Sequence, residues 1–271
     1  KAGLPDGAVN LICGRGREVG AYLVSHRAVD QIVFTGSVPT GQSILCDAAQ
    51  HAIPSVMELG GKSAAIAFAD ANREQLLASV QSGIFFNAGQ VCSAMSRLLV
   101  QRDIYEEVVE AVVAMAEGLS VGLGQDNADL TPVVSAGQLA GIEALCRRAV
   151  EDGAVAVTGG EAFADRAGHF MRPTVFRDVT PQMCIAQEEV FGPFVSVSRF
   201  STEQEALTMA NDSPFGLAGA IRTNDVTRAH RVAARLKCGI VWVNDHHRLD
   251  PASPWGGVKD SGIGRECGTE S

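Results

Sequence analysis

One cysteine of this sequence stands in a setting typical of covalent catalysis. Cys92 lies within Phe86–Arg97, among small and amide residues, and precedes the apolar run Arg97–Gln101, which predicts a buried strand. A thiol reacts only as the thiolate, so its surroundings must lower its pKa or provide a base, and the side chain must stay partly exposed. The stretch therefore predicts a nucleophilic thiol where a helix gives way to a sheet, a common place for functional groups.

A candidate base occurs 34 residues before the cysteine. Glu58 ends the predicted strand Ile53–Glu58 and precedes Gly60 and Gly61, which let other groups approach the backbone closely. A carboxylate with a tuned pKa takes a proton from a thiol or from water. The alternative is a surface glutamate paired with Lys62, and this segment by itself favours that alternative.

Two glycine-containing turns are candidates for nucleotide binding. Gln31–Thr35 predicts a buried strand that runs into Gly36 and Ser37 and then a helix, and free N–H groups at a helix N-terminus favour a pyrophosphate. A tight strand-to-helix connection with Ser37 as N-cap explains the same pattern. The earlier turn Gly14–Gly20 follows a predicted strand at 9–13, but its glycine spacing differs by one residue from the dinucleotide fingerprint and favours a plain loop.

Composition and charge exclude several classes of protein. The chain has 271 residues, 46% of them hydrophobic, and a net charge of -9, which argues against nucleic-acid or anionic-membrane partners. No apolar run is long enough to span a membrane. The seven cysteines form no Cys-x-x-Cys pair, so neither a disulfide framework nor a metal site is predicted, and a reducing cytoplasm is the expected compartment. Apolar surroundings predict core positions for Cys13, Cys46, Cys146 and Cys238, while Cys184 and Cys267 are undecided.

Hydrophobic periodicity predicts an α/β protein throughout. Helices are expected at 72–87, 103–118, 135–153, 202–211 and 224–236. Strands are expected at 64–69, 97–101, 154–158, 170–176, 194–200 and 239–243.

Five segments, in this order, resemble the signature segments of the NAD(P)-dependent aldehyde dehydrogenase superfamily. They are Met57–Ser63 (MELGGKS), Phe85–Ala94 (FFNAGQVCSA), Gln187–Pro193 (QEEVFGP), Val241–Asn244 (VWVN) and Pro254–Glu266 (PWGGVKDSGIGRE). The spacing between the glutamate and the cysteine matches as well, and the resemblance spans the whole chain.

The resemblance implies a fold and a division of the chain. It implies a three-layer α/β/α catalytic domain at 62–259 and, at 1–61, the remnant of a Rossmann-like cofactor domain. Residues 260–271 would be the return segment to the cofactor domain, with the oligomerisation strand absent. Members of the family are longer, so the chain is expected to be a fragment that lacks the asparagine completing the oxyanion hole. Alone, it is expected to bind NAD poorly and to turn over little.

The resemblance also implies roles for the two candidate catalytic residues. Cys92 would add to an aldehyde to give a thiohemiacetal and then, after hydride transfer, a thioester, with its own backbone N–H as half of the oxyanion hole. Glu58 would be the general base for the thiol or for the water that releases the acid.

A cofactor site and a substrate pocket follow from the same comparison. The cofactor would be NAD, with NADP as the alternative. Its pyrophosphate would bind at Gly36 and Ser37, and its ribose hydroxyls would bind to Glu189. Phe191 would pack beside the nicotinamide, and Leu59 would make a further contact. The substrate would be a small aldehyde, and the pocket would contain Phe86, Val91, Ser93, His246 and Trp255.

The sequence does not decide how polar the substrate pocket is. His246 and His247, with Asp245, could shape it, although a solvated loop explains them equally well. Aromatic walls such as Trp255 occur in relatives that accept amino- or trimethylammonio-aldehydes. The parent enzyme is expected to be a homodimer or homotetramer.

Two other functions are compatible with these segments. In a CoA-acylating semialdehyde dehydrogenase, CoA rather than water resolves the thioester, and the retention of Glu58 argues against it. A non-catalytic binding or structural protein on the same scaffold is disfavoured by the intact set of Cys92, Glu58 and Glu189. The sequence does not identify the aldehyde.

Overall fold

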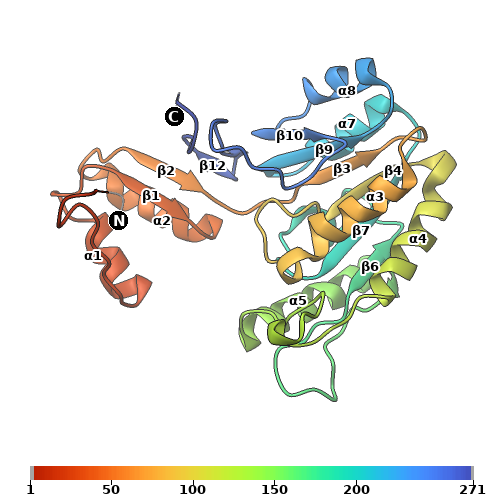
Figure 1. Cartoon of the computed structure of the whole chain (residues 1–271), viewed down its shortest axis with the longest axis horizontal. Coiled ribbons are helices and arrows are strands. Elements are labelled where there is room, and N and C mark those ends of the chain that lie inside the picture. The colour runs from red at the N-terminus through yellow and green to blue at the C-terminus, as the bar shows by residue number, and fades with distance from the viewer. Residues whose placement is uncertain (1–2, 270–271) are drawn as a thin grey trace.

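The computed structural model describes residues 3–269 as two α/β units (Figure 1). The smaller unit is built from the first part of the chain and receives one short strand from its end, and the larger unit takes most of the residues between. Within residues 3–269, no helix combines the length and the apolar character needed to cross a membrane.

The smaller unit is a three-stranded sheet with its helices beside it. Its strands, in spatial order, are β1 (Ile32–Thr35), β2 (Ser55–Glu58) and β12 (Gly262–Ile263). Its helical segments are a π-helical turn (Gly16–Gly20), α1 (Ala21–Val24) and α2 (Val38–Ala49). β1 is parallel to β2, and β12 runs antiparallel along the other edge of β2. Ile32, Ile53 and Met57 pack with Ala48 of α2 to form a small core.

The larger unit contains a seven-stranded sheet. Its order is β10 (Ile240–Val243), β9 (Ala218–Arg222), β3 (Ala64–Ala67), β4 (Arg97–Gln101), β7 (Phe194–Phe200), β6 (Thr174–Arg177) and β5 (Val155–Thr158). Every neighbouring pair is parallel except β5 and β6. A separate antiparallel pair is formed by β8 (Phe215–Gly216) and β11 (Val258–Lys259).

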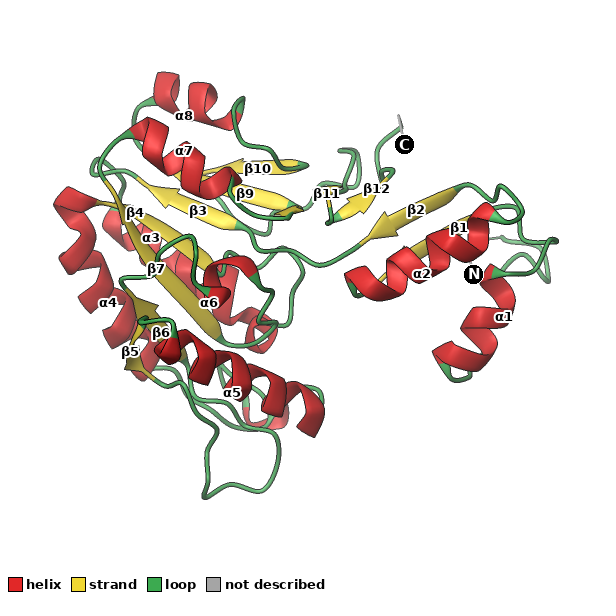
Figure 2. Cartoon of the chain, turned by 180° about the vertical axis from the view of Figure 1, so that it is seen from behind, coloured by secondary structure: helices red, strands yellow, loops and turns green. Residues whose placement is uncertain are grey.

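Helices cover both faces of this sheet (Figure 2). They are α3 (Arg73–Val80), α4 (Tyr105–Glu117), α5 (Ala136–Glu151), α6 (Cys184–Gln187), α7 (Glu203–Asn211) and α8 (Val226–Ala233). Side chains alternate between the faces of a strand, so Leu98 packs in the core that includes α3 and α4, while Leu99 packs in the core that includes α7 and α8. The predicted three-layer α/β/α arrangement with a second, smaller sheet is confirmed.

Four helices begin close to their predicted starts, and each has a side-chain N-cap. The side chains of Asn72, Ser135, Thr202 and Asp225 each accept the backbone N–H three residues later. These are N-cap bonds, and each satisfies one of the free N–H groups of a first helical turn. The predicted starts of α3, α5, α7 and α8 are therefore confirmed to within two residues.

Some local predictions are wrong. The run 9–13 is no strand: within residues 3–269 no other strand pairs with it, so its backbone groups have no ladder partner, and Leu11 is 89% exposed. The helix predicted at 72–87 ends at Val80 and continues as a π-helical turn (Gln81–Phe85) and a 3-10 turn (Phe86–Gly89).

The cysteines are only partly where apolar surroundings predict them. Cys146 is buried in the core, as predicted, and Cys184 is buried too. Cys13 and Cys46 are exposed, because the first lies in the unpaired run 9–13 and the second on the outer face of α2. Cys238 is half-buried, and Cys267 is exposed.

Ser261 joins the two units. Its side chain is fully buried; Oγ donates to the Gly60 carbonyl at 2.7 Å and accepts the Gly216 N–H at 2.9 Å. The Ser261 carbonyl accepts the Leu59 N–H at 2.9 Å. One buried residue thus connects the end of β2, the start of β8 and the segment before β12.

Replacing Ser261 by alanine is expected to lower the free energy of unfolding by about 2 kcal/mol, because two buried backbone groups lose their partner. Urea denaturation of the natural-length protein measures this. Ser25→Ala is the matched control, since that exposed serine bonds only to Ala21 and Tyr22 of its own helix, and its effect should stay below about 0.5 kcal/mol. Equal effects of the two substitutions would contradict the role assigned to Ser261.

Candidate active site

Cys92 lies in a loop whose backbone turns sharply before β4. Asn87 and Ala88 both have left-handed conformations, with φ of 51° and 53°, and Gly89 follows with φ of 71°. For a residue with a side chain, this conformation costs about 1–2 kcal/mol. The Asn87 side chain supports the turn by donating from Nδ2 to the Gln90 carbonyl at 3.0 Å. The turn ends the helical segment and carries the chain to the half-buried Cys92.

This loop rests on the loop that follows Glu189. A side chain at Gly89 would place its Cβ 1.8 Å from the Gly192 carbonyl oxygen, so only glycine allows the contact. Gln138, in the first turn of α5, donates from Nε2 to the Val190 and Phe191 carbonyls at 3.2 and 2.9 Å. Phe191 itself is left-handed, with φ of 51°. Two strained loops therefore support each other beside the thiol.

The Cys92 thiol is not activated by its electrostatic surroundings. Burial raises its pKa above the ordinary value, and the nearby carboxylates of Glu189 and Glu58 raise it further, while the backbone N–H groups of Ser93 and Cys92 act in the opposite direction. Of the two routes to a thiolate, the structure therefore favours proton removal by a base.

Glu58 has the properties of that base. It is 4% exposed, its Oε2 accepts the Trp255 indole N–H at 3.0 Å, and its Oε1 has no hydrogen-bond partner. Burial raises the pKa of Glu58 to about 7, helped by the charge of Glu266, whereas the Trp255 hydrogen bond and Arg265 act to lower it. The carboxylate therefore exchanges protons near neutral pH. The alternative of a surface ion pair with Lys62 is wrong, since both side chains are buried and no salt bridge joins them.

The two glycines after Glu58 leave space for two other parts of the site. A Cβ at Gly60 would lie 2.3 Å from Oε2 of Glu189, and a Cβ at Gly61 would lie 2.1 Å from the Cys92 carbonyl oxygen. The Gly61 N–H donates to Glu189 Oε1 at 3.0 Å. Burial raises the pKa of Glu189, and this hydrogen bond opposes the rise. The thiol loop and Glu189 thus both contact one dipeptide.

A cleft of about 630 Å³ brings most of the predicted site residues together. It is lined by Thr35, Gly36, Ser37, Glu58, Leu59, Gly60, Gln90, Val91, Cys92, Gln138, Glu189 and Phe191. Gln90, which follows the 3-10 turn Phe86–Gly89, and Gln138, in the first turn of α5, were not predicted as site residues, because a single amide side chain carries no distinctive sequence signal. Among residues 3–269, no group of three or more His, Cys, Asp and Glu side chains is placed to hold a metal ion.

The N-terminus of α2 opens on this cleft. Ser37 occupies the N-cap position, but its side chain accepts no backbone N–H of the helix and instead bonds to Thr40 Oγ1 at 2.9 Å. The Gly36 N–H donates to the Glu58 carbonyl at 3.0 Å, which fixes the turn to the end of β2. First-turn N–H groups without a side-chain cap favour an anionic group beside them.

The other predicted pocket residues form an aromatic cluster beside Glu58. Trp242 lies 6.2 Å from Trp255, 4.9 Å from His246 and 6.2 Å from His247, and Phe86 lies 6.1 Å from His247, measured between ring centroids. Trp242 and Trp255 also line a second cleft of about 450 Å³. Phe86 is 63% exposed, whereas Ser93 is buried. Trp255 is the link between this cluster and the first cleft, because its N–H bonds to Glu58.

His246 belongs to the protein interior, and His247 is half-buried beside it. His246 is 9% exposed, and both of its ring nitrogens lack a side-chain or backbone partner. Burial and the neighbouring His247 and Arg222 lower the pKa of His246 to about 3, and burial also lowers the pKa of His247. Both rings are therefore neutral at physiological pH.

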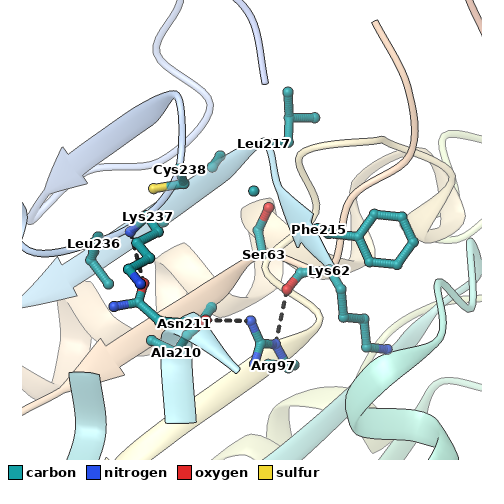
Figure 3. A pocket seen from close by; sticks show the side chains of 14 residues that line it. Lys62, Ser63, Arg97, Ala210, Asn211, Phe215, Leu217, Leu236, Lys237 and Cys238 are labelled. Atoms are coloured by element: carbon teal, nitrogen blue, oxygen red, sulfur yellow. Dashed lines mark hydrogen bonds between the residues drawn. The ribbon is translucent and has the colours of Figure 1, made fainter. Parts of the chain in front are cut away.

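A small pocket is lined by Lys62, Ser63 and the buried Arg97 (Figure 3). Arg97 donates to the carbonyls of Lys62, Met209 and Ala210 at 2.9, 2.9 and 2.8 Å. It connects the segment after Gly61 with the end of α7. The Lys62 side chain runs away from this pocket (Figure 3).

The fold and the cleft define an α/β protein in which a thiol and a buried carboxylate line one cleft together with a helix N-terminus that has no side-chain cap. The chain belongs to the aldehyde dehydrogenase family, whose model matches residues 1–271. The putative aldehyde dehydrogenase DhaS of Bacillus subtilis is 42% identical over 270 residues, which cover 99% of this chain and 54% of that protein. The betaine aldehyde dehydrogenase of the same organism is also 42% identical, over 99% of this chain and 56% of that protein.

Solved structures give the same result. The betaine aldehyde dehydrogenase of Staphylococcus aureus in complex with NAD+ superposes with a TM-score of 0.95 at 44% identity, covering 99% of this chain and 54% of that one. The chain spans about half the length of the relatives it matches.

Replacing Gly60 or Gly61 by alanine should have different effects on stability, although neither glycine has a left-handed φ. Gly61→Ala is expected to lower the free energy of unfolding by about 3 kcal/mol, because its Cβ meets a backbone carbonyl that cannot move alone. Gly60→Ala should cost about 1 kcal/mol or less, because its Cβ meets the end of the Glu189 side chain, which can swing away at the cost of one hydrogen bond. Urea denaturation of both variants tests this order, and the reverse order would refute it.

Proposed function

We propose that the natural-length protein containing this chain is an NAD(P)-dependent aldehyde dehydrogenase, which oxidises an aldehyde to a carboxylic acid through a thioester at Cys92. NAD is the proposed cofactor and NADP the alternative. The observation that carries the proposal is the shared cleft: Cys92, Glu58 and Glu189 line it together with the N-terminus of α2 at Ser37. Family membership, and a relative crystallised with NAD+, support the same reaction.

We assign cofactor binding to residues 1–61 with the return segment 260–271, and the thiol chemistry to 62–259. The pairing of β12 with β2 supports this division, because it brings the return segment into the smaller sheet.

The residues of the cleft fit a dinucleotide. Only one oxygen of the Glu189 carboxylate accepts a hydrogen bond from the described residues, that from Gly61, so Oε2 is free to accept from a ribose hydroxyl. The turn at Gly36 and Ser37 suits a pyrophosphate, Phe191 would lie beside the nicotinamide, and Leu59 would contact the cofactor. When bound, the cofactor supplies the hydride acceptor.

The first chemical step is addition of the thiol to the aldehyde. Glu58 takes the proton from Cys92 Sγ, the sulfur adds to the carbonyl carbon, and the aldehyde oxygen becomes an oxyanion that accepts the Cys92 backbone N–H. Addition gives the carbon an oxyanion whose electron pair expels hydride, which a free aldehyde lacks. Loss of hydride leaves a thioester on Cys92.

The second step is hydrolysis. Glu58 takes a proton from water, the hydroxide adds to the thioester, and the carbon–sulfur bond breaks to release the carboxylic acid and restore the thiol. A pKa near 7 lets the same carboxylate accept a proton in each step, release the first to solvent and give the second to the departing Cys92 sulfur.

The substrate would be a small aldehyde bound by Phe86, Val91, Ser93, His246 and Trp255. Several relatives are named betaine aldehyde dehydrogenase or aminoaldehyde dehydrogenase, and the faces of aromatic side chains favour an ammonium group. We therefore propose an aldehyde with a cationic amine, handled by a cytoplasmic homodimer or homotetramer without nucleic-acid or membrane partners. Seven unpaired cysteines and the net charge of -9 support this setting.

Cys92→Ala is expected to reduce NADH formation at least about a thousandfold, because the thioester cannot form. Glu58→Gln, which keeps the size of the side chain, should reduce steady-state turnover about a hundredfold, because it cannot accept a proton. An assay over a panel of amino- and trimethylammonio-aldehydes measures both. Cys46→Ala, at an exposed cysteine, is the control. Wild-type activity of Cys92→Ala would refute the mechanism, and turnover that requires added CoA would favour the acylating reaction.

Trp255→Phe should shift the pH dependence of kcat/KM. It removes the N–H that favours the ionised form of Glu58, so the pKa of Glu58 rises above about 7 and the rate increases only at higher pH. Trp242→Phe is the matched control, since that indole donates to the Arg248 carbonyl instead. If the midpoint of the pH dependence of kcat/KM does not shift in Trp255→Phe, or shifts equally in both variants, the assignment of Glu58 as the base is contradicted.

A further inference from the structure

The peptide bond between Gly60 and Gly61 has no side chain on either side to hold its orientation. Glycine has no Cβ and adopts conformations that other residues avoid, so a peptide unit between two glycines rotates with few steric barriers. This unit must nevertheless keep one orientation, because its N–H donates to Glu189 Oε1 at 3.0 Å. The orientation therefore has to be fixed by a contact from elsewhere in the chain.

Ser261 provides that contact from the opposite side of the peptide. Its Oγ donates to the Gly60 carbonyl at 2.7 Å. A trans peptide unit is planar, and its C=O and N–H point in opposite directions, so a contact that fixes the carbonyl also fixes the N–H. The Ser261 hydroxyl and the Glu189 carboxylate thus bind the two ends of one peptide dipole.

The Ser261 hydroxyl is itself held in place. The side chain is fully buried, and Oγ accepts the Gly216 N–H at 2.9 Å. A hydroxyl carries a single proton, and with Gly216 bound to a lone pair that proton is directed to the Gly60 carbonyl. The main chain is fixed as well, because the Ser261 carbonyl accepts the Leu59 N–H at 2.9 Å. The hydroxyl is therefore a rigid donor that is shielded from water.

The hydrogen bonds on the two sides of the peptide support each other. A carbonyl that accepts a hydrogen bond polarises its amide, which makes the N–H of the same unit a stronger donor. Gly60 is buried, and a buried carbonyl that loses its donor is costly. Without the Ser261 hydroxyl, the carbonyl would turn toward another donor, and the Gly61 N–H would turn away from Glu189 with it.

We propose that Ser261 is a positioning residue of the cofactor site: its hydroxyl holds the Gly60–Gly61 peptide so that the Gly61 N–H keeps the Glu189 carboxylate directed toward the cofactor ribose. The inference rests on the proposed function. A carboxylate that is held before binding accepts hydrogen bonds from the ribose hydroxyls without the entropy cost of ordering its side chain. Loss of the Ser261 hydroxyl is thus expected to weaken NAD binding through Glu189.

The test is a double-mutant cycle in the natural-length protein with Ser261→Ala, Glu189→Ala and the double variant. Calorimetry measures the Kd for NAD in the absence of substrate. Ser261→Ala should raise Kd about fivefold, the effect expected of one hydrogen bond. In the Glu189→Ala background the increase should be less than about twofold, because both residues act through one peptide. The backbone bond between Ser261 and Leu59 does not involve the side chain, so the return segment stays in place.

Ser198→Ala is the matched control for a loss of stability. Ser198 is also buried and its Oγ donates to the Val179 carbonyl at 2.6 Å, but it does not line the cleft. Thermal denaturation without NAD should show that both alanine variants are less stable than the wild type, whereas only Ser261→Ala should bind NAD more weakly. Ser261→Cys, whose thiol is a weak donor, is a second variant in case alanine prevents folding, and it should weaken NAD binding too.

An unchanged Kd in both Ser261 variants would overturn the inference. So would an equal increase in Ser198→Ala, or the same fivefold increase in the Glu189→Ala background, because either result would mean that Ser261 does not act through Glu189. The enzyme assignment stands in all of these cases. Absence of NAD binding by the wild type would instead overturn the proposed function, and this inference with it.

Discussion

The site depends on the close approach of two chain segments to a backbone without side chains. At Gly60 the Glu189 carboxylate occupies the space of a Cβ, and at Gly61 the Cys92 carbonyl does the same. A nucleophile loop and a carboxylate from distant parts of the chain are thereby held against the dipeptide that follows the base. Backbone contact at Gly61 fixes the Cys92 loop, and the hydrogen bond from the Gly61 N–H holds the Glu189 carboxylate, which is a form of preorganisation that a chemical step requires.

Hydrogen bonding then separates the roles of two buried carboxylates in one cleft. Burial raises the pKa of both. Glu58 receives an indole N–H from the aromatic cluster and also feels the charge of Glu266, so its proton remains exchangeable near pH 7. Glu189 receives a backbone N–H from Gly61, which opposes the effect of burial on its pKa. The two acids differ because different elements supply their partners.

The sequence predicted the parts of the molecule that depend on local pattern. Periodicity found α4, α5, β4 and β7 and placed four helix starts to within two residues, and short motifs located Cys92, Glu58 and Glu189. It failed where the outcome depends on distant contacts. The run 9–13 has strand-like composition but no strand beside it in residues 3–269, and the helix predicted to continue to residue 87 changes to a π-helical turn after Val80. The contact of Gln138 with the loop after Glu189 leaves no local sequence signal at all.

The bond from Trp255 to Glu58 joins residues 197 positions apart, and that from Ser261 to Gly60 joins residues 201 apart. Contacts of such separation form late in folding, because the entropy of closing a long loop must be overcome first. During synthesis, Cys92 and Glu58 both leave the ribosome well before Trp255 does. The surroundings that set the pKa of Glu58 are therefore completed at the end of assembly, and a chain that stalls earlier contains Cys92 and Glu58 without the indole N–H that bonds to Glu58.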